Sequence, residues 1–514
     1  MDPTAYDVAV VGFGPAGVVA SALLGQAGLR VYACDRMQAV YELPRAIALD
    51  HEIMRVFQQL GVAAAIEPYV EPFTPSEYYG VDGQLIRRMT MLAPPYPQGY
   101  TPSLVFTQTA VERVLRARVA QLPNVRVDLG TELCALEQEE ADGVRLELQS
   151  ASGERERVHA RWLIACDGGG STLRGLLSAK LEDLSFDEAW LVVDVRVNER
   201  GLAKLPAVSV QYCEPERACT LVIGPGNHRR WESSLKPDED PQQVATPQGT
   251  WQLLARWITP EDGELWRQAS YRFHALVAER WQHGRVFLAG DAAHMQPPFL
   301  GQGMCQAVRD VSNLAWKLIA VARGEVWGAA ARALLDSYAL ERKAHVQELT
   351  KRIKAVGALI CERDPSRARE RDARLLAECG GVIKDTPRQD ILPRLEAGML
   401  FSRNSSARGT LFPQPLLAAG ACDDRPVLMD ERFGCGWRLV LDRTLPLPHP
   451  LQPALRVIAF GTDACRERQG VVAGWLRQHA CHAALIRPDH YVYGVATTSQ
   501  ELSELLAHWR AALS

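Results

Sequence analysis

The chain has 514 residues, of which 47% are hydrophobic and 23% are charged, and its formal net charge is −4 at pH 7. The length predicts about three domains, and the composition is that of an ordinary globular protein with a sizeable core. The mixed, slightly acidic charge argues against a nucleic-acid partner. No run of about 18 apolar residues predicts a membrane span and no basic leader opens the chain, so we expect a cytoplasmic protein without a membrane partner.

The 12 cysteines are scattered along the chain. Their spacing includes no Cys-x-x-Cys pair and no Cys/His cluster typical of zinc sites, so we predict neither a metal site nor a redox dithiol. Most of these cysteines should be small buried apolar groups.

The N-terminal stretch predicts a βαβ unit that binds a dinucleotide. An apolar strand over 6–11 leads into a Gly-x-Gly-x-x-Gly loop, and an apolar helix and a second strand over 29–33 follow. A carboxylate comes about 20 residues after the glycines, where it can accept hydrogen bonds from ribose hydroxyls. Because this carboxylate repels a 2′-phosphate, the unit suits the ADP half of FAD or NAD rather than NADP. The candidate cofactor-binding residues here are Gly12, Gly14, Gly17, Asp35 and Arg36.

The next segment contains two candidate site residues of different kinds. Arg45 lies in the loop 44–47, and His51 follows Asp50 at the start of a predicted helix. Arg45 is either a site residue or a solvated loop arginine. His51 is either a general base or a surface residue in the first turn of its helix, and Asp50 is a second candidate base.

Residues 68–102 are rich in Pro, Gly and Tyr, and the alternation over 81–86 predicts a hairpin. We interpret this stretch as an excursion into a second, sheet-rich domain. Gln108 then opens a helix, where it either contacts a cofactor or faces water. Alternating strands over 125–148 follow, and an apolar strand leads to the run Asp-Gly-Gly-Gly-Ser-Thr-Leu-Arg at 167–174.

Alternating apolar runs at 190–197, 208–212 and 220–223 predict a sheet. Tyr212 is a candidate pocket residue on one of these strands, although a strand tyrosine more often packs in a core. Arg229 and Arg230 are adjacent, and neighbouring strand residues point to opposite faces, so at most one of them can face the pocket.

The most informative motif begins with a short apolar strand over 286–289. This strand ends at Gly290 and Asp291, which places a carboxylate where the chain leaves a sheet and can meet the polyhydroxyl part of a ligand. Two prolines at 297–298 then prevent an immediate helix.

A helix follows at Gly301, Gly303 and Met304. The two glycines let a ring or a phosphate approach main-chain N–H groups, and the helix directs its positive dipole end toward that ligand. Apolar residues at helical spacing up to Leu318 anchor the helix by a buried face.

The remainder of the chain predicts helices and then a small α/β domain. Residues 330 to about 376 are helical, with a break at Asp364-Pro365, and residues 381–410 are interpreted as a linker. The C-terminal section has predicted strands and helices that alternate; the strands are at 437–441, 455–460 and 490–495, and the helices are at 469–479 and 499–512.

At these motifs the chain resembles the class A flavoprotein aromatic hydroxylases, which are single-component FAD monooxygenases. Three fingerprints of that family occur in the expected order: the loop 12–17, Asp-Gly-x-x-Ser-x-x-Arg at 167–174, and Gly-Asp-Ala-Ala-His with Pro-Pro and Gly-Gln-Gly at 290–303. The run 297–318 is most similar to the branch that hydroxylates 3-(3-hydroxyphenyl)propionate, except that Ala307 replaces the more usual glycine.

The resemblance implies an α/β fold in three parts. A Rossmann-like FAD-binding domain similar to that of p-hydroxybenzoate hydroxylase would comprise residues 1–75, 103–183 and 272–380. A mainly β substrate domain would comprise 76–102 and 184–271. After the linker 381–410, residues 411–514 would form a thioredoxin-like α/β domain. Because this last domain lacks a redox motif, we expect a structural or dimer-stabilising role, and a homodimer is compatible with it.

The resemblance also implies a set of site residues. Arg45 would lie near the flavin and Pro298 would present its carbonyl near the reactive edge of the ring. The predicted FAD-binding set is completed by Gln108, Asp167, Asp291, Gly301, Gly303 and Met304, besides Arg45 and the N-terminal residues.

The implied chemistry is that of an NAD(P)H-dependent monooxygenase. NADH or NADPH would reduce the bound FAD, O2 would give a C4a-hydroperoxyflavin, and its distal oxygen would pass to a phenolic substrate. We predict hydroxylation of a 3-(3-hydroxyphenyl)propionate-like phenol ortho to its hydroxyl. Tyr212, His51 and Asp50 all remain candidates for the base that activates the phenol.

Three other functions use parts of the same pattern. Hydroxylation of another aromatic or polyketide-like phenol would need the same motifs. A flavin-dependent halogenase would need a Trp-x-Trp-x-Ile-Pro motif, which Trp251, Trp257 and the run 258–260 do not provide. A flavin-binding sensor without turnover would keep the three fingerprints and lack a substrate base.

Overall fold

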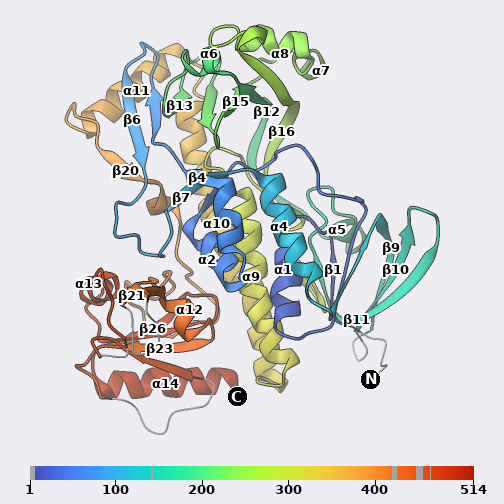
Figure 1. Cartoon of the computed structure of the whole chain (residues 1–514), viewed down its shortest axis with the longest axis vertical. Coiled ribbons are helices and arrows are strands. Elements are labelled where there is room, and N and C mark those ends of the chain that lie inside the picture. The colour runs from blue at the N-terminus through green and yellow to red at the C-terminus, as the bar shows by residue number, and fades with distance from the viewer. Residues whose placement is uncertain (1–5, 140–142, 419–424, 447–454, 463–464) are drawn as a thin grey trace.

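The computed structural model describes residues 6–139, 143–418, 425–446, 455–462 and 465–514. Figure 1 shows three parts: the N-terminal sheet with its long helices, a second large sheet at the top of the view, and the C-terminal domain at the lower left. Among the described residues, no helix has both the length and the apolar content needed to cross a membrane. Residues 1–5 of the predicted FAD-binding domain and 140–142 of the predicted strands over 125–148 lie outside the described residues.

The first sheet confirms the predicted βαβ opening. Its central strands are parallel: Val8 of β1 pairs with Val31 of β2 and with Trp162 of β11. Parallel sheets of α/β proteins are covered on both faces, so these strands are buried. The order is β17-β18-β11-β1-β2-β8; β10 also pairs with β11, and β9 pairs with β10. The strands are β1 (Tyr6–Val11), β2 (Val31–Asp35), β8 (Val125–Leu129), β9 (Thr131–Glu139), β10 (Gly143–Ser150), β11 (Arg155–Ala165), β17 (Gln282–His283) and β18 (Val286–Leu288).

Helices cover this sheet, and α1 packs against both α4 and α9 while α10 packs along α9. A small three-stranded sheet, β3-β7-β4, lies beside them. Asp364 accepts hydrogen bonds from the N–H groups of Ser366 and Arg367 and so begins α11 after the predicted break. The elements are α1 (Pro15–Gln26), β3 (Ala48–Asp50), α2 (His51–Gln59), α3 (Ala63–Ile66), β4 (Val70–Pro72), β7 (Ser103–Phe106), α4 (Gln108–Ala120), α5 (Thr172–Leu176), α9 (Gly303–Ala322), α10 (Gly328–Ile360) and α11 (Pro365–Glu378).

The second sheet has nine strands in the order β19-β16-β12-β15-β14-β13-β5-β6-β20. The hairpin predicted at 81–86 is present as the β5–β6 turn. The segment predicted as a linker also contributes to this sheet, because β20 pairs with β6. The strands are β5 (Ser76–Tyr79), β6 (Leu85–Thr90), β12 (Leu181–Val197), β13 (Ser209–Tyr212), β14 (Cys219–Ile223), β15 (His228–Ser234), β16 (Gly263–Ala278), β19 (His294–Met295) and β20 (Asp385–Pro387).

The two faces of this second sheet have different neighbours. On the face toward the first sheet, the Trp190 ring contacts Phe299, and Val222 packs with Ile47. We call this the inner face. The outer face packs under α6 (Glu199–Leu202), α7 (Pro241–Val244) and α8 (Pro247–Leu254), and its core includes Trp231. Because side chains alternate along a strand, residues 230 and 232 share the inner face while Trp231 points outward.

The C-terminal domain contains a four-stranded sheet in the order β24-β23-β25-β26, with β23 and β24 parallel and the other pairs antiparallel. This arrangement confirms the predicted thioredoxin-like α/β domain, and β25 is the strand that the sequence pattern did not reveal. The elements are β21 (Leu416–Leu417), β22 (Val427–Leu428), α12 (Met429–Phe433), β23 (Trp437–Leu441), β24 (Leu455–Ala459), α13 (Val471–Gln478), β25 (Ala483–Ile486), β26 (Val492–Ala496) and α14 (Ser499–Leu513).

Buried ion pairs join this domain to the helices of the first sheet. Arg55 of α2 donates to Asp430 with an Nε–Oδ2 distance of 2.5 Å, and Arg438 pairs with the same carboxylate. Asp430, Cys435 and His490 could geometrically approach one metal ion. The two guanidinium groups already neutralise Asp430, which disfavours a cation there.

A second buried cluster centres on Glu341 of α10. Its carboxylate accepts from Arg487 at 2.6 Å and from Lys317 at 2.9 Å, and all three side chains are fully buried. Burial acts to raise the pKa of Glu341, but the two cations outweigh it, so the pKa lies well below its usual value. A charge held in this way is stable only while its partners remain.

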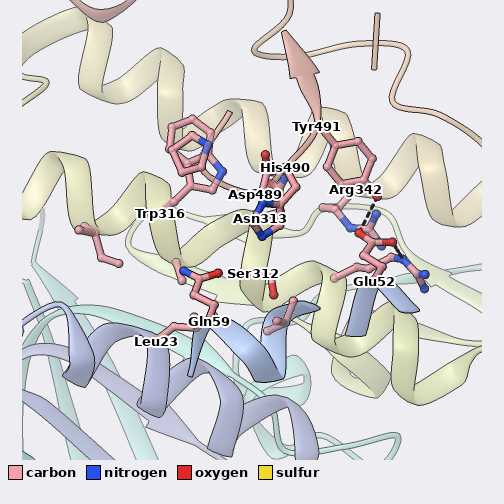
Figure 2. Close-up of a pocket in the computed structure, with 15 residues that line it drawn as sticks. Leu23, Glu52, Gln59, Ser312, Asn313, Trp316, Arg342, Asp489, His490 and Tyr491 are labelled. Carbon is pink, nitrogen blue, oxygen red and sulfur yellow. Dashed lines mark hydrogen bonds and ion pairs between the residues drawn. The ribbon is translucent and has the colours of Figure 1, made fainter. Parts of the chain in front are cut away.

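A cavity of about 40 Å³ lies between the C-terminal domain and the helices of the first sheet, and Figure 2 shows its lining. Tyr491 donates to Glu52 at 2.9 Å, and Asn313 donates to Asp489 at 3.0 Å. Pockets for aromatic ligands are roughly 300–1,000 Å³. We therefore interpret this cavity as a packing gap at the domain interface.

We expect Glu341→Gln to destabilise the protein by about 3–5 kcal/mol, because the change leaves Lys317 and Arg487 buried without their counter-charge. Thermal unfolding followed by circular dichroism measures the effect. Glu348→Gln is the matched control, since Glu348 forms a solvent-exposed pair with Arg352 on the same helix and should contribute about 0.3–0.5 kcal/mol. Equal unfolding midpoints for the two variants would contradict this prediction.

Candidate active site

The glycine loop after β1 leaves room for a dinucleotide. A Cβ atom at Gly12 would overlap the carbonyl of Cys166, and one at Gly17 would overlap the carbonyl of Gly12. These two glycines are needed for close backbone packing. Gly14, which precedes the first turn of α1, faces open space instead. The free N–H groups of that turn therefore point to a space that fits a pyrophosphate.

Asp35 holds this loop in place from the end of β2. Its Oδ2 accepts from the N–H of Phe13 at 2.6 Å, and its Oδ1 accepts from the N–H of Met37 at 2.8 Å. Each oxygen retains a lone pair for a ribose hydroxyl. Arg36 is exposed next to it. Arg116 of α4, which the sequence pattern did not reveal, donates to the carbonyl of Phe13 at 2.8 Å.

The second fingerprint forms a tight turn around Asp167. The carboxylate of Asp167 accepts from the hydroxyl of Ser171 at 2.6 Å and from the N–H of Leu173 at 3.0 Å. Arg174 donates to the carbonyl of Gly169, and at 3.2 Å to the carbonyl of Ala292. The second and third fingerprints are thus joined directly.

The third fingerprint places Asp291 between β18, at the edge of the first sheet, and β19, at the edge of the second. Its side chain is accessible to solvent, yet desolvation by the surrounding protein raises its pKa. Arg45 and His294 act in the opposite direction. His294 itself is buried and bonded to Asp310 at 2.7 Å, so it supports the loop.

The turn at the start of α9, which we call the Gly301 turn, has a geometry that suits the predicted contact with a flavin. Gly301 adopts a left-handed φ of 62°, and its N–H donates to the carbonyl of Pro298 at 2.7 Å. Gly303 has open space beside it, and Met304 is half-buried in the same turn. The first N–H groups of the helix are therefore available to an electron-rich ring.

The Arg45 segment is fixed by its main chain, while its side chain remains exposed. Gln108 accepts hydrogen bonds from the N–H groups of Arg45 at 3.0 Å and Ala46 at 2.6 Å. Arg230 donates to the carbonyl of Arg45 at 2.7 Å. The guanidinium of Arg45 lies over the Tyr41 ring. Gln108 thus acts here by positioning the segment.

The structure argues against the three base candidates from the sequence. Asp50 caps α2 and pairs with Arg309 at 2.6 Å. His51 is buried, and burial lowers its pKa to about 4, so it is a weak proton acceptor at neutral pH. Tyr212 points to the outer face, where its ring packs against Trp257 at 5.3 Å, which places it on the wrong side of the sheet.

Two other charged residues have the placement that those candidates lack. Glu232 lies on the inner face of β15 and is 8% exposed. Arg388 follows β20 and donates at 3.1 Å to the carbonyl of Leu300, which immediately precedes the Gly301 turn. Within the described part of the chain, Arg388 forms no ion pair with a carboxylate. Local pattern could not reveal either residue, because their placement depends on pairing between distant strands.

Comparisons with known proteins show the family of the chain. A family model described as an FAD binding domain matches residues 5–353. The chain is 34% identical to "Probable NADH-specific resorcinol 4-hydroxylase" of Rhodococcus jostii, over 99% of this chain and 96% of that protein. It is 30% identical to "3-(3-hydroxy-phenyl)propionate/3-hydroxycinnamic acid hydroxylase" of Burkholderia cenocepacia, over 94% and 93%.

Among solved structures, the fold matches aklavinone-11 hydroxylase in complex with FAD and aklavinone, with a TM-score of 0.80 and 22% identity over both whole chains. It also matches the flavin-dependent monooxygenase PieE in complex with FAD and substrate, with a TM-score of 0.78 and 21% identity over both whole chains. The fold and the FAD-fitted site define a flavin-dependent monooxygenase of the p-hydroxybenzoate hydroxylase type. The chain belongs to the family of FAD-dependent aromatic hydroxylases and is an NAD(P)H-dependent monooxygenase. The family predicted from the three fingerprints is therefore confirmed.

We expect Gly17→Ala to yield protein with little bound FAD, because the added Cβ would displace the loop that packs on Gly12. The ratio of flavin to protein absorbance after purification measures this loss. Gly474→Ala in α13 is the control, since it has space for a methyl group in a helix and should retain full FAD content. A fully flavinylated Gly17→Ala protein would contradict the assignment of this loop.

Proposed function

We propose that the protein hydroxylates a meta-substituted phenol ortho to its hydroxyl, with NADH as the reductant and O2 as the oxygen source. The first substrate candidate is a 3-(3-hydroxyphenyl)propionate-like acid. The position of Arg388 is the observation that carries this candidate. Its guanidinium contacts the carbonyl of Leu300, just before the Gly301 turn, and has no carboxylate partner among the described residues. The names of the relatives support the phenol class, and the Rhodococcus relative's name supports NADH.

Arg388 is suited to the carboxylate end of such a substrate. It lies over the Phe73 ring at 4.2 Å and reaches Ser76 of β5 and the carbonyl of Leu300. Those contacts use only two of its five N–H donors. Desolvation lowers the pKa of Arg388, which is the effect expected of a cation that lacks a counter-charge. A substrate carboxylate would supply that charge through charge-assisted hydrogen bonds.

The rest of the site would bind and enclose the reacting groups. The glycine loop, Asp35 and the first turn of α1 would hold the ADP part of FAD, and Asp291 with the turn at Gly301 would hold the ribityl and ring parts. When bound, FAD supplies the redox and oxygen-transfer chemistry. The second sheet, whose Trp190 packs on Phe299, would cover the flavin and exclude water from the reacting atoms.

A second candidate is a neutral dihydroxybenzene of the resorcinol type. The higher identity of the relative whose name contains resorcinol 4-hydroxylase favours it. This candidate needs no cation at Arg388. The two substrates can therefore be separated by one substitution.

We expect Arg388→Met to raise KM for 3-(3-hydroxyphenyl)propionate by about 10- to 100-fold, which corresponds to loss of a charged hydrogen bond of about 1.5–3 kcal/mol. KM for resorcinol should change by less than about threefold, and Arg388→Lys should restore part of the acid's affinity. Arg88→Met is a control, because Arg88 is paired with Glu77 in the same sheet. An equal KM change for both substrates would contradict the role of Arg388.

The reaction itself is tested on purified FAD-loaded protein with NADH or NADPH and a panel of phenolic acids, simple phenols and polyketide-like aromatics. We expect NADH consumption coupled to O2 uptake and a product heavier by one oxygen atom, with the new hydroxyl next to the old one. Nucleotide oxidation that gives only hydrogen peroxide would exclude the tested substrates. Absence of any stimulated oxidation would instead support a flavin-binding sensor.

A further inference from the structure

Glu232 occupies the centre of the inner face of the second sheet. It lies on β15, between Val192 on β12 and Thr220 on β14. Arg230 and Ser234 precede and follow it on the same face. This is the face that meets the loop carrying Phe299 and the segment carrying Arg45, so Glu232 shares its face with residues that contact the predicted flavin site.

The cations nearest to Glu232 are already occupied. Arg230 donates to both oxygens of Asp194, at 2.7 and 3.0 Å. Arg267 donates to the carbonyl of Pro44 and to the hydroxyl of Tyr271. Neither guanidinium forms an ion pair with Glu232, although both are close enough to influence it electrostatically.

The polar groups on the other side are occupied as well. The hydroxyl of Thr220 donates to the side-chain oxygen of Gln211. Among the residues that the structure describes, none donates a hydrogen bond to the carboxylate of Glu232, and the residue is 8% exposed. A buried carboxylate without donors is costly, so this position is suited to a group that a ligand supplies.

The electrostatic surroundings give Glu232 the proton affinity of a general base. Burial raises its pKa to about 7, with Asp194 acting in the same direction and Arg230 and Arg267 against it. The two other titratable groups here, His228 and Tyr271, are bonded to Asp194 and Arg267. At neutral pH a large fraction of Glu232 is therefore a carboxylate, and it is unpaired.

We propose that Glu232 is the catalytic residue that accepts the hydrogen bond, and then the proton, of the substrate's phenol hydroxyl. The proposal rests on the proposed function, because it requires a phenolic substrate. In this step the phenol O–H bond breaks, its electron pair stays on the phenolate oxygen, and a new O–H bond forms on the carboxylate. No electron is transferred. The phenolate activates the ring carbon ortho to it, and the protonated carboxyl can return the proton to the catechol product.

The positions of Glu232 and Arg388 fit the two ends of one substrate. β15 and β5 are separated by three strand spacings in the order β15-β14-β13-β5, which is roughly 14 Å at about 4.8 Å per spacing. Arg388 reaches back from the β5 side, where it contacts Ser76. An acidic tail would then lie toward the cation while the hydroxyl lies under the carboxylate.

The first test measures the hydrogen bond between substrate and Glu232 without turnover. Holoenzyme with oxidised FAD is titrated with 3-(3-hydroxyphenyl)propionate and with resorcinol between pH 6 and 10, and ultraviolet difference spectra record the state of the bound phenol. Free phenols ionise near pH 10, and a neighbouring carboxylate disfavours the phenolate, so the bound phenol should remain protonated at pH 8. We expect the wild-type protein to show the red-shifted band of a phenol that donates to an ionised carboxylate, growing as pH rises through about 7, and Glu232→Gln to lack this change. A wild-type spectrum that does not change between pH 6 and 8 would overturn the proposal, whatever the variants do.

The second test measures product formation against pH. We expect wild-type kcat/KM to rise as pH increases through about 7, because the base must be deprotonated. Glu232→Gln should form product about 100-fold more slowly at pH 7 and recover as pH approaches the pKa of the free phenol. Glu232→Asp should recover part of the rate. Glu264→Gln, which removes an exposed carboxylate of the same sheet, should match the wild type.

These results separate the two levels of the proposal. Failure of the wild-type protein to hydroxylate any phenol would overturn the proposed function. A wild-type hydroxylase whose Glu232→Gln variant keeps its FAD, its rate and its pH profile would overturn only the role of Glu232.

Discussion

Asp310 is the buried charge on which the arrangement of the flavin site depends. Its carboxylate, on α9, accepts from the N–H of Gly290 at 2.9 Å, from His294 at 2.7 Å and from Arg342 at 2.9 Å. Burial acts to raise the pKa of Asp310, but His294 and Arg342 outweigh it and the pKa lies below its usual value. Since an ionised carboxylate tolerates this environment only with all of its donors, the strand end at Gly290, the following loop and α10 are held in one relative position.

The preceding residue of α9 connects this arrangement to the C-terminal domain. Arg309 donates to Asp50 at 2.6 Å, to Glu52 at 2.5 Å and to Gln302 of the Gly301 turn at 3.1 Å. Tyr491 of the C-terminal domain donates to the same Glu52. A continuous path of buried hydrogen bonds therefore runs from that domain to the turn above which the flavin ring would lie. Such a path fits the structural role that we predict for the C-terminal domain, which has no Cys-x-x-Cys motif.

The parts of the site that the sequence predicted are those that depend on a few consecutive residues. The Gly12 loop, the Asp167 turn and the Gly301 turn each carry backbone geometry that only their local pattern allows. Alternation alone does not decide between pocket and core for Tyr212. Trp257, which follows α8, covers the outer side of its strand, so both faces are partly apolar, and the structure shows the core alternative. The sequence pattern does not predict a role for Glu232, because its surroundings are formed by residues of β12, β14 and β16, which are distant along the chain.

On the inner face of the second sheet, one charged residue is paired and its neighbour is not, and this difference can connect the substrate to the flavin site. Arg230 binds Asp194 on one side and the carbonyl of Arg45 on the other, so it links the second sheet to the segment beside the flavin site. Glu232, two residues along the same strand, is the neighbouring charge that changes if a phenol gives up its proton. Protonation of Glu232 removes one negative charge near Arg230 and strengthens the relative hold of Asp194 on it. Under our proposal, substrate ionisation and the position of the Arg45 segment are therefore coupled through a single guanidinium group.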